Sequence, residues 1–405
     1  MTTERVHGRR ILDLLLNPGD LAFRDEMRRF LVDNVSPGTR RAMDLTTAFI
    51  ADPAVMRDFH RALHSKGWSV PHWPIEHGGT SWTPVQRYIF DLECGRAGAA
   101  IYNASGSHFV GPVIIHYGTQ AQKETYLPGI RSGEDYWAQG YSEPGSGSDL
   151  ASLKTKAESD GDDYVVTGQK IWTTNAHYAN RLFALVRTST TGKRQEGITF
   201  LLIHMDTPGV SVRPIIGNGG DHEFNEVFFD RARIPKGNRI GEENKGWEVA
   251  KYLLEFERGG RSLAGQVRAQ FARLVRLTLA RCPDDASIRI RLAEIGTDLD
   301  AMEMIDISML SALQAGTNPG PISSLLKLRW SEIRQSIDEL AMDVIGEDAL
   351  AWRPERPFYE TLQLPPEEEE SLAVTPRYLN SRAFTIMGGT SEIQTNILAK
   401  SLVGL

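Results

Sequence analysis

The stretch QGYSEPGSGSDL occupies residues 139–150, and IWTTN follows at residues 171–175. The first stretch is rich in glycine and serine, so its backbone can approach a flat ring or a phosphate closely while offering hydrogen-bond donors. It stands where the pattern of the chain changes from helical segments to short strand-like runs. From these residues alone, both a linker between two domains and a ligand-binding loop remain open.

The part of the chain before this stretch is predicted to be mostly helical. Phe23, Met27 and Leu31 recur at helical spacing, and Asp20 precedes them as a candidate N-cap. Prolines and glycines crowd residues 68–83, which predicts a loop there.

The part after this stretch is predicted to be a small β domain. Gly161 lies between two aspartates, a combination typical of a hairpin turn. Short runs of β-branched and aromatic residues alternate with turn residues, and several short strands in sequence favour a small barrel or a sandwich. The candidate strands are residues 164–167, 182–187, 198–204, 210–214 and 226–229.

Helical periodicity returns at Gly246 and continues to the end of the chain. A long amphipathic segment over residues 246–277 is followed by predicted helices at 288–314, 323–345 and 378–403, which together favour a four-helix bundle. The run of glutamates at 367–370 is predicted to be part of a solvated loop.

These patterns predict an α+β multidomain protein. We place an N-terminal helical domain at residues 1–133, a small β-barrel at 134–240 and a C-terminal four-helix bundle at 241–405. A chain of 405 residues is long enough for several hydrophobic cores.

The composition of the chain argues against several classes of function. The formal net charge of -7 argues against a nucleic-acid or membrane-surface partner. The two cysteines, Cys94 and Cys282, show no metal-ligand spacing, so we expect free thiols and no metal site. Without a long apolar run near the N-terminus, we expect a cytoplasmic protein.

Five stretches together resemble the acyl-CoA dehydrogenase family: SEPGSGSD, GQKIWTTN, EFNEVFFDRARIP, GEENKGW and GGTSEIQTNILAK. The resemblance extends over residues 23–405. It implies the three-domain fold of that family and an FAD enzyme that converts an acyl-CoA thioester to the trans-2-enoyl-CoA. It also implies electron-transfer flavoprotein as the partner that accepts the electrons.

The resemblance also implies the residues that contact the cofactor. Trp172 is expected to pack on the flavin, Thr174 to hydrogen-bond near its N5 atom, and Ser148 to lie near the pyrophosphate and the pantetheine of the substrate. The full set of cofactor contacts implied is Gln139, Gly140, Tyr141, Ser142, Gly147, Ser148, Trp172, Thr173, Thr174, Thr390 and Glu392.

The catalytic base departs from the pattern of much of the family. The glutamate expected just before the Gly-Thr pair of the C-terminal motif is replaced by Gly388. In isovaleryl-CoA and long-chain dehydrogenases the base comes instead from the helix that opens the C-terminal bundle, and Glu257 matches that position. Gly388 is then expected to donate its N–H to the thioester carbonyl, and Arg258, Gly389 and Ser148 to contact substrate.

The residues around Glu257 agree with this assignment. Ala250, Leu253 and Leu254 place Glu257 on or beside an apolar stripe that continues to Arg261 and Ala264 on one predicted helix. A carboxyl group in an apolar pocket has a raised pKa and is a stronger base. The simpler interpretation is an ion pair between Glu257 and a neighbouring arginine.

A second departure concerns the adenylate half of the FAD site. In homotetrameric members a Gln-x-x-Gly-Gly segment of a neighbouring subunit contributes there, but this chain has Asp343 and Glu347 at the matching positions. Carboxylates near a diphosphate are electrostatically unfavourable. The chain is similar to the large subunits of α2β2 dehydrogenases of the pimeloyl-CoA and steroid-side-chain type, which implies a smaller paralogous partner subunit.

Two other functions fit the same resemblance. An acyl-CoA oxidase or flavin monooxygenase would differ in the access of oxygen to reduced flavin. A non-catalytic subunit that binds acyl-CoA or FAD would explain the missing glutamate at Gly388. The acyl group itself, whether polycyclic, dicarboxylic, branched or long, is left open by the sequence.

Overall fold

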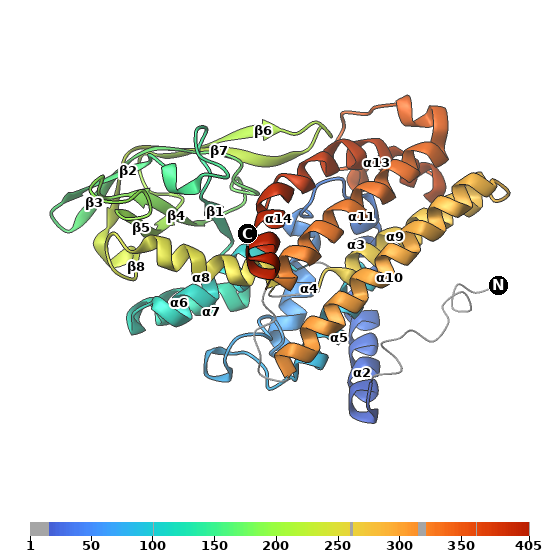
Figure 1. Ribbon diagram of the computed structural model, residues 1–405, viewed down its shortest axis with the longest axis horizontal. Helices are drawn as coiled ribbons and strands as arrows, with labels where there is room; N and C mark the ends of the chain where they lie inside the picture. The colour runs from blue at the N-terminus through green and yellow to red at the C-terminus, as the bar shows by residue number, and fades with distance from the viewer. Residues whose placement is uncertain (1–15, 100, 260–261, 315–320, 362, 405) are drawn as a thin grey trace.

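The computed structural model describes residues 16–99, 101–259, 262–314, 321–361 and 363–404. A helical region, a β-sheet region and a second helical region follow one another along the chain, and the sheet lies at the opposite end of the molecule from the tips of the long C-terminal helices (Figure 1). The predicted order of a helical domain, a small β-barrel and a helical bundle is confirmed.

The N-terminal region consists of helices with strong start signals. Asn17, Ser36, Asp52, Thr83 and Thr119 cap five of them through their side chains, and proline follows at the first turn of four. The helices are α2 (Pro18–Asn34), α3 (Pro37–Leu45), α4 (Pro53–Lys66), α5 (Pro84–Arg96), α6 (Gly111–Tyr117) and α7 (Gln120–Ser132).

The prediction of Asp20 as the first N-cap is wrong. Asn17 caps α2 by accepting from the backbone N–H of Asp20, and the Asp20 carboxylate accepts from the backbone N–H of Asn17 in return. Asp20 is thus the second half of a capping box, which satisfies two backbone donors at the helix start.

The middle region is a single eight-stranded sheet with strand order β6-β7-β3-β2-β4-β5-β8, and β1 pairs with β4. Side chains from β3, β4, β5 and β7 share one buried cluster, so the sheet curves around its own core as a small barrel does. The strands are β1 (Trp137–Gly140), β2 (Lys156–Asp160), β3 (Asp163–Lys170), β4 (Arg181–Arg187), β5 (Ile198–His204), β6 (Val210–Ile216), β7 (His222–Pro235) and β8 (Arg239–Ile240).

All five predicted strands are present, and Gly161, with φ of 60°, lies in the two-residue turn between β2 and β3. The strands β1, β2 and β8 were not expected. They are short, and β2 has a single buried residue, so apolar alternation could not reveal them.

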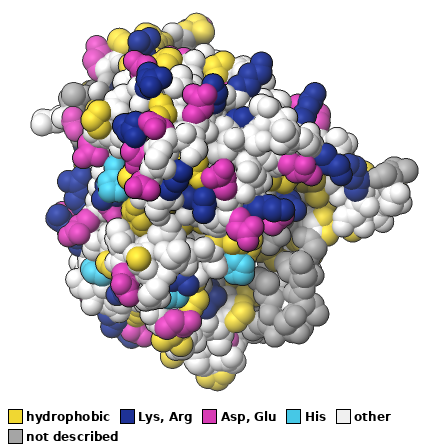
Figure 2. All heavy atoms as spheres, turned by 90° about the vertical axis from the view of Figure 1, so that its left-hand side faces the viewer, with side chains coloured by type: hydrophobic (Ala, Val, Ile, Leu, Met, Phe, Trp, Pro, Cys, Tyr) yellow, Lys and Arg dark blue, Asp and Glu magenta, His cyan; other side chains and the backbone are white. Residues whose placement is uncertain are grey.

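The outer face of the sheet is covered by helices. Phe183 and Phe200 of the sheet pack in one cluster with Val249 and Leu253 of α8 (Gly246–Gly259). Positive and negative side chains are interspersed over the surface at this end of the molecule (Figure 2). α8 therefore belongs to the packing around the sheet as much as to the C-terminal region.

The C-terminal bundle begins after α8. The prediction of one continuous helix over residues 246–277 is wrong, because Ser262 and Leu263 are not helical and α9 starts at Ala264. The bundle consists of α9 (Ala264–Arg281), α10 (Ala286–Gln314), α11 (Ile322–Ile345) and α13 (Pro366–Ser381). The predicted four-helix architecture is confirmed, and α10 and α11 match two of the predicted helices.

The bundle is joined to the N-terminal region at a close helix crossing. A Cβ atom added to Gly265 of α9 would stand 2.5 Å from the backbone oxygen of Leu92 on α5, and one added to Gly95 would stand 2.5 Å from the backbone nitrogen of Gln266. Because only glycine permits this approach, the two helices touch backbone to backbone.

Two further predictions at the C-terminal end are corrected. The glutamates at 367–370 begin α13 rather than a solvated loop, and Glu369 is buried against Arg41, with its oxygens 2.6 and 3.0 Å from the guanidinium nitrogens. The predicted helix over 378–403 is instead the end of α13, a turn, and α14 (Ser391–Leu398), which packs on α11.

No helix among the described residues is long and apolar enough to cross a membrane. Cys94 and Cys282 are free thiols, as expected.

Candidate functional site

The two motifs singled out in the sequence meet in space. The backbone N–H of Ile171 donates to the carbonyl oxygen of Ser142 at 2.9 Å. Gln139 and Gly140 end strand β1, and Tyr141 is buried directly after it. The Ser-Glu-Pro turn and the segment after β3 therefore form one continuous edge of the barrel.

A buried ion pair holds this edge in place. The Lys170 side chain is fully buried, and its Nζ lies 2.7 Å from the Glu143 carboxylate and 3.2 Å from the Tyr141 carbonyl oxygen. The same carboxylate accepts from the backbone N–H groups of Lys154 and Thr155. The pair thus joins the Ser-Glu-Pro turn to β3 and to the start of β2.

Burial lowers the pKa of Lys170 to about 8, although the Glu143 carboxylate opposes the shift. Burial raises the pKa of Glu143, but Lys170 and the accepted hydrogen bonds outweigh it and leave the pKa below its ordinary value. Neither residue was selected from the sequence. Lys170 lies beyond the predicted strand at 164–167, and its even spacing from Tyr164 and Val166 was the available signal that it is buried near a carboxylate.

The segment after β3 has an unusual backbone and an exposed aromatic ring. Trp172 adopts φ of 60°, in the left-handed region, and its side chain is 57% exposed. Backbone hydrogen bonds from Thr173 to Asn225 and from Asn175 to Glu223, at 3.0 and 2.8 Å, hold this conformation against β7. A bulky residue in this region of φ is an outlier that local hydrogen bonds must maintain.

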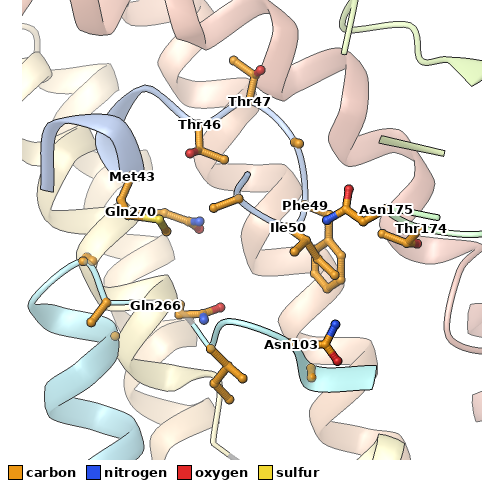
Figure 3. Close-up of a pocket in the computed structure, with 18 of the residues that line it drawn as sticks. Met43, Thr46, Thr47, Phe49, Ile50, Asn103, Thr174, Asn175, Gln266 and Gln270 are labelled. Carbon is orange, nitrogen blue, oxygen red and sulfur yellow. The ribbon is translucent and has the colours of Figure 1, made fainter. Parts of the chain in front are cut away.

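Thr174 lines a cavity of about 100 Å³ to which all three regions of the fold contribute. Phe49 and Ile50 come from the loop after α3, Asn103 from the N-terminal region, and Gln266 and Gln270 from α9; their arrangement around Thr174 and Asn175 is visible in Figure 3. Sites at the junction of domains are the usual place for a cofactor or substrate.

Glu223 joins the three regions beside this cavity. Its buried carboxylate accepts from the backbone N–H groups of Phe49 and Ile50, at 3.0 and 2.9 Å, and from the side chain of Asn380 on α13. Its carbonyl oxygen accepts from Asn175. Burial raises the pKa of Glu223 to about 7 despite these hydrogen bonds.

This raised pKa predicts a pH-dependent stability. Between about pH 4.5 and 7 the folded protein holds a proton on Glu223 that the unfolded chain has lost, so the contribution of this residue to stability falls as pH rises. We expect wild type to lose stability relative to Glu223→Gln between pH 5 and 8, by at most roughly 3 kcal/mol. Thermal unfolding of both proteins across this range measures the difference, and a constant gap would contradict the assignment.

Several other predicted contacts lie on exposed turns. Gly147 and Ser148 are exposed, and a Cβ added to Gly147 would meet no atom within 4 Å. Thr390 caps α14 by accepting from the backbone N–H of Ile393, and Glu392 is exposed on the same short helix. No hydrogen bond among the described residues connects these two residues to the Ser-Glu-Pro turn.

The residues expected to act on the substrate are described only in part. Glu257 and Arg258 fall within the backbone of α8, one turn after the buried Leu253, but their side chains lie outside the described residues, as does Arg261. Gly388 and Gly389 have φ of 65° and 88°, and their carbonyl oxygens accept from the buried Gln394 amide at 3.2 and 3.4 Å. The Gly388 N–H donates no hydrogen bond within the described part of the chain.

The residues at this edge fit a flavin. Thr173 Oγ1 is buried and has no hydrogen-bond partner among the described residues. Trp172 offers an exposed aromatic face, and Thr174 brings a hydroxyl group to the cavity. An aromatic face and adjacent donors are what a flat, polar ring system requires.

Three domains meet around this cavity: a helical domain, a small β-barrel and a four-helix bundle. This arrangement defines the class of three-domain flavoprotein dehydrogenases. The sequence matches the acyl-CoA dehydrogenase family in all three parts: its N-terminal domain over residues 17–134, its middle domain over 138–232 and its C-terminal domain over 244–403. The chain belongs to the acyl-CoA dehydrogenase family and is an oxidoreductase acting on acyl-CoA.

Individual relatives resemble nearly the whole chain. Acyl-CoA dehydrogenase IpdE1 of Mycobacterium tuberculosis is 38% identical, over 95% of this chain and 97% of its own length. Among solved structures, the Tcur3481-Tcur3483 steroid ACAD superposes with a TM-score of 0.81 at 27% identity, covering 96% of this chain and 98% of its own. The ChsE4-ChsE5 complex from Mycobacterium tuberculosis gives 0.80 at 29% identity, with the same coverage.

Proposed function

We propose that this chain is the catalytic subunit of an FAD-dependent acyl-CoA dehydrogenase that forms a trans double bond between the α and β carbons of the thioester. The observation that carries the proposal is the link between Ser142 and Ile171. Trp172 follows Ile171 directly and is exposed, and Thr174 lines a cavity to which all three domains contribute, which supports the proposal.

FAD, when bound, supplies the acceptor for the hydride that leaves the β carbon. The chain itself must hold the ring, remove the α-proton and stabilise the charge that develops on the thioester oxygen. The candidates for binding the flavin ring are Gln139, Gly140, Tyr141, Ser142 and the segment Trp172–Thr174. The N–H of Gly388, which has no partner in the described structure, is the candidate for the thioester oxygen.

We assign the removal of the α-proton to Glu257. Gly388 has no carboxylate to offer at the position where much of the family has its glutamate. Ala250 and Leu253 of α8 are buried against the sheet, and Glu257 follows Leu253 by four positions, which is about one helical turn. An apolar setting of this kind raises a carboxyl pKa and strengthens the base.

We further propose that a smaller paralogous subunit completes the FAD site and that electron-transfer flavoprotein takes the electrons. Asp343, which stands where the homotetrameric pattern has glutamine, pairs with Arg291, and Glu347, which stands where the pattern has glycine, is exposed just after α11. This surface therefore presents carboxylates rather than amide and glycine contacts. The similarity to two complexes of two different subunits supports the same arrangement.

The test is anaerobic reduction of the bound flavin. We expect the chain co-expressed with its paralogous partner to carry FAD and to lose its flavin absorbance when an acyl-CoA is added. Because one similar structure is a steroid enzyme, ring-bearing acyl groups belong in the panel beside linear and branched ones.

Three other outcomes of this flavin-reduction experiment would each indicate a different function or assembly. A lone chain with stoichiometric FAD and full turnover would contradict the need for a partner. Flavin that bleaches and is then rapidly reoxidised by air would indicate an oxidase. Flavin that never bleaches, although acyl-CoA binds, would indicate a non-catalytic subunit.

A further inference from the structure

A second cavity of about 60 Å³ adjoins the first. Gly95, Ala99, Ile101 and Gln266 line both cavities, so the two are neighbours across the crossing of α5 and α9. Thr174 and Asn175 line only the first cavity, whereas Arg87 lines only the second. A chain that starts beside Thr174 and continues past Gly95 therefore ends near Arg87.

Arg87 is the unusual residue of this second cavity. It is partly buried on α5, and its Nε is buried without a hydrogen-bond partner in the described part of the chain. No described carboxylate forms an ion pair with it, whereas Arg28 of α2 and Arg96 of α5 both pair with Glu93. Burial lowers the pKa of Arg87, and no neighbouring acid offsets the shift.

Several other polar groups of the cavity already form hydrogen bonds. Asp91 accepts from the backbone N–H of Ser262 at 3.1 Å, and the His72 and His108 rings stack on each other and both bond to Ser107. His60 bonds to the Arg131 carbonyl oxygen, and burial lowers its pKa to about 4, so it is neutral. Of the described Lys, Arg, Asp and Glu residues, Arg87 and Asp91 line this cavity.

A buried guanidinium N–H without an acceptor is costly unless a ligand supplies one. Since the Asp91 carboxylate lines the same cavity and would repel a second carboxylate, a neutral oxygen suits the cavity better. We propose that the second cavity receives the far end of the acyl group and that Arg87 donates a hydrogen bond to a carbonyl or hydroxyl oxygen there. This assignment of substrate class rests on the proposed function.

The test compares three acyl-CoAs of equal length whose distal ends are a plain alkyl group, a ketone and a carboxylate. Turnover is measured as kcat/KM, and binding is measured as Kd of the matching unreactive 3-thia analogues. We expect the complex to favour the ketone over the alkyl compound about ten-fold or more, as one charge-assisted hydrogen bond allows. In Arg87→Met the ratio of kcat/KM for the ketone to kcat/KM for the alkyl compound should fall to near one.

The matched control is Arg61→Met, which removes an exposed arginine of α4 that pairs with Asp58. It should leave the preference unchanged. Three outcomes would overturn the inference: Arg87→Met still prefers the ketone, wild type prefers the alkyl compound, or no analogue binds. If the carboxylate compound gives the highest kcat/KM and the lowest Kd, the choice of a neutral oxygen is overturned. Loss of turnover with every compound, with the binding preference intact, would refute the proposed reaction but not the role of Arg87.

Discussion

Glu257→Gln is expected to slow the reduction of flavin by acyl-CoA roughly 10²- to 10⁴-fold, the usual contribution of a positioned general base. Glutamine keeps the shape of the side chain but cannot accept a proton. Binding of the substrate should therefore persist while the chemical step fails. Stopped-flow measurement of flavin absorbance without oxygen gives the rate, and the spectral change caused by an unreactive thioether analogue gives the binding.

Glu255→Gln is the matched control, because it makes the same change on α8 two positions earlier, about 200° around the helix. It should reduce flavin at close to the wild-type rate. If both variants bleach as fast as wild type, Glu257 is not the base, and the carboxylates of the partner subunit become the candidates. If Glu257→Gln fails to bind the analogue, its role is in binding rather than in proton transfer.

Lys170→Met is expected to destabilise the protein by about 3–5 kcal/mol, because it leaves the buried Glu143 carboxylate without its cation. The Ser-Glu-Pro turn should loosen at the same time, since the Lys170 ammonium also donates to the Tyr141 carbonyl oxygen. We therefore expect a lower midpoint of thermal unfolding together with weaker retention of flavin. Both can be measured on one preparation of the complex.

Lys156→Met provides the control on the neighbouring strand β2. Lys156 pairs with Glu158 at the surface, with both side chains more than half exposed, so its loss should change stability by less than about 1 kcal/mol. The double change Lys170→Met with Glu143→Gln removes both buried charges and should recover part of the stability. Equal unfolding midpoints for the two single variants would show that the buried pair does not hold the turn.

Much of the fold follows from local pattern. The five long strands, the hairpin at Gly161 and the bundle helices α10 and α11 could be predicted because their apolar residues repeat with the period of the element that contains them. The Ser-Glu-Pro turn and the Ile-Trp-Thr-Thr-Asn segment could be recognised as a pair from their order along the chain. The single hydrogen bond from Ile171 to Ser142 shows that they share one edge of the barrel.

The residues that hold the site in place could not be found in this way. Glu143 and Lys170 are 27 positions apart in the sequence, and Glu369 and Arg41 are 328 positions apart. Because a charged residue is predicted to be solvent-exposed unless its partner is known, these buried pairs could not be predicted. The break between α8 and α9 was hidden because both helices carry apolar stripes of the same period. The local sequence pattern determines which secondary structure each segment prefers. A charged side chain can be buried only where the tertiary fold brings a partner to it. For Arg87 we infer that this partner is the substrate.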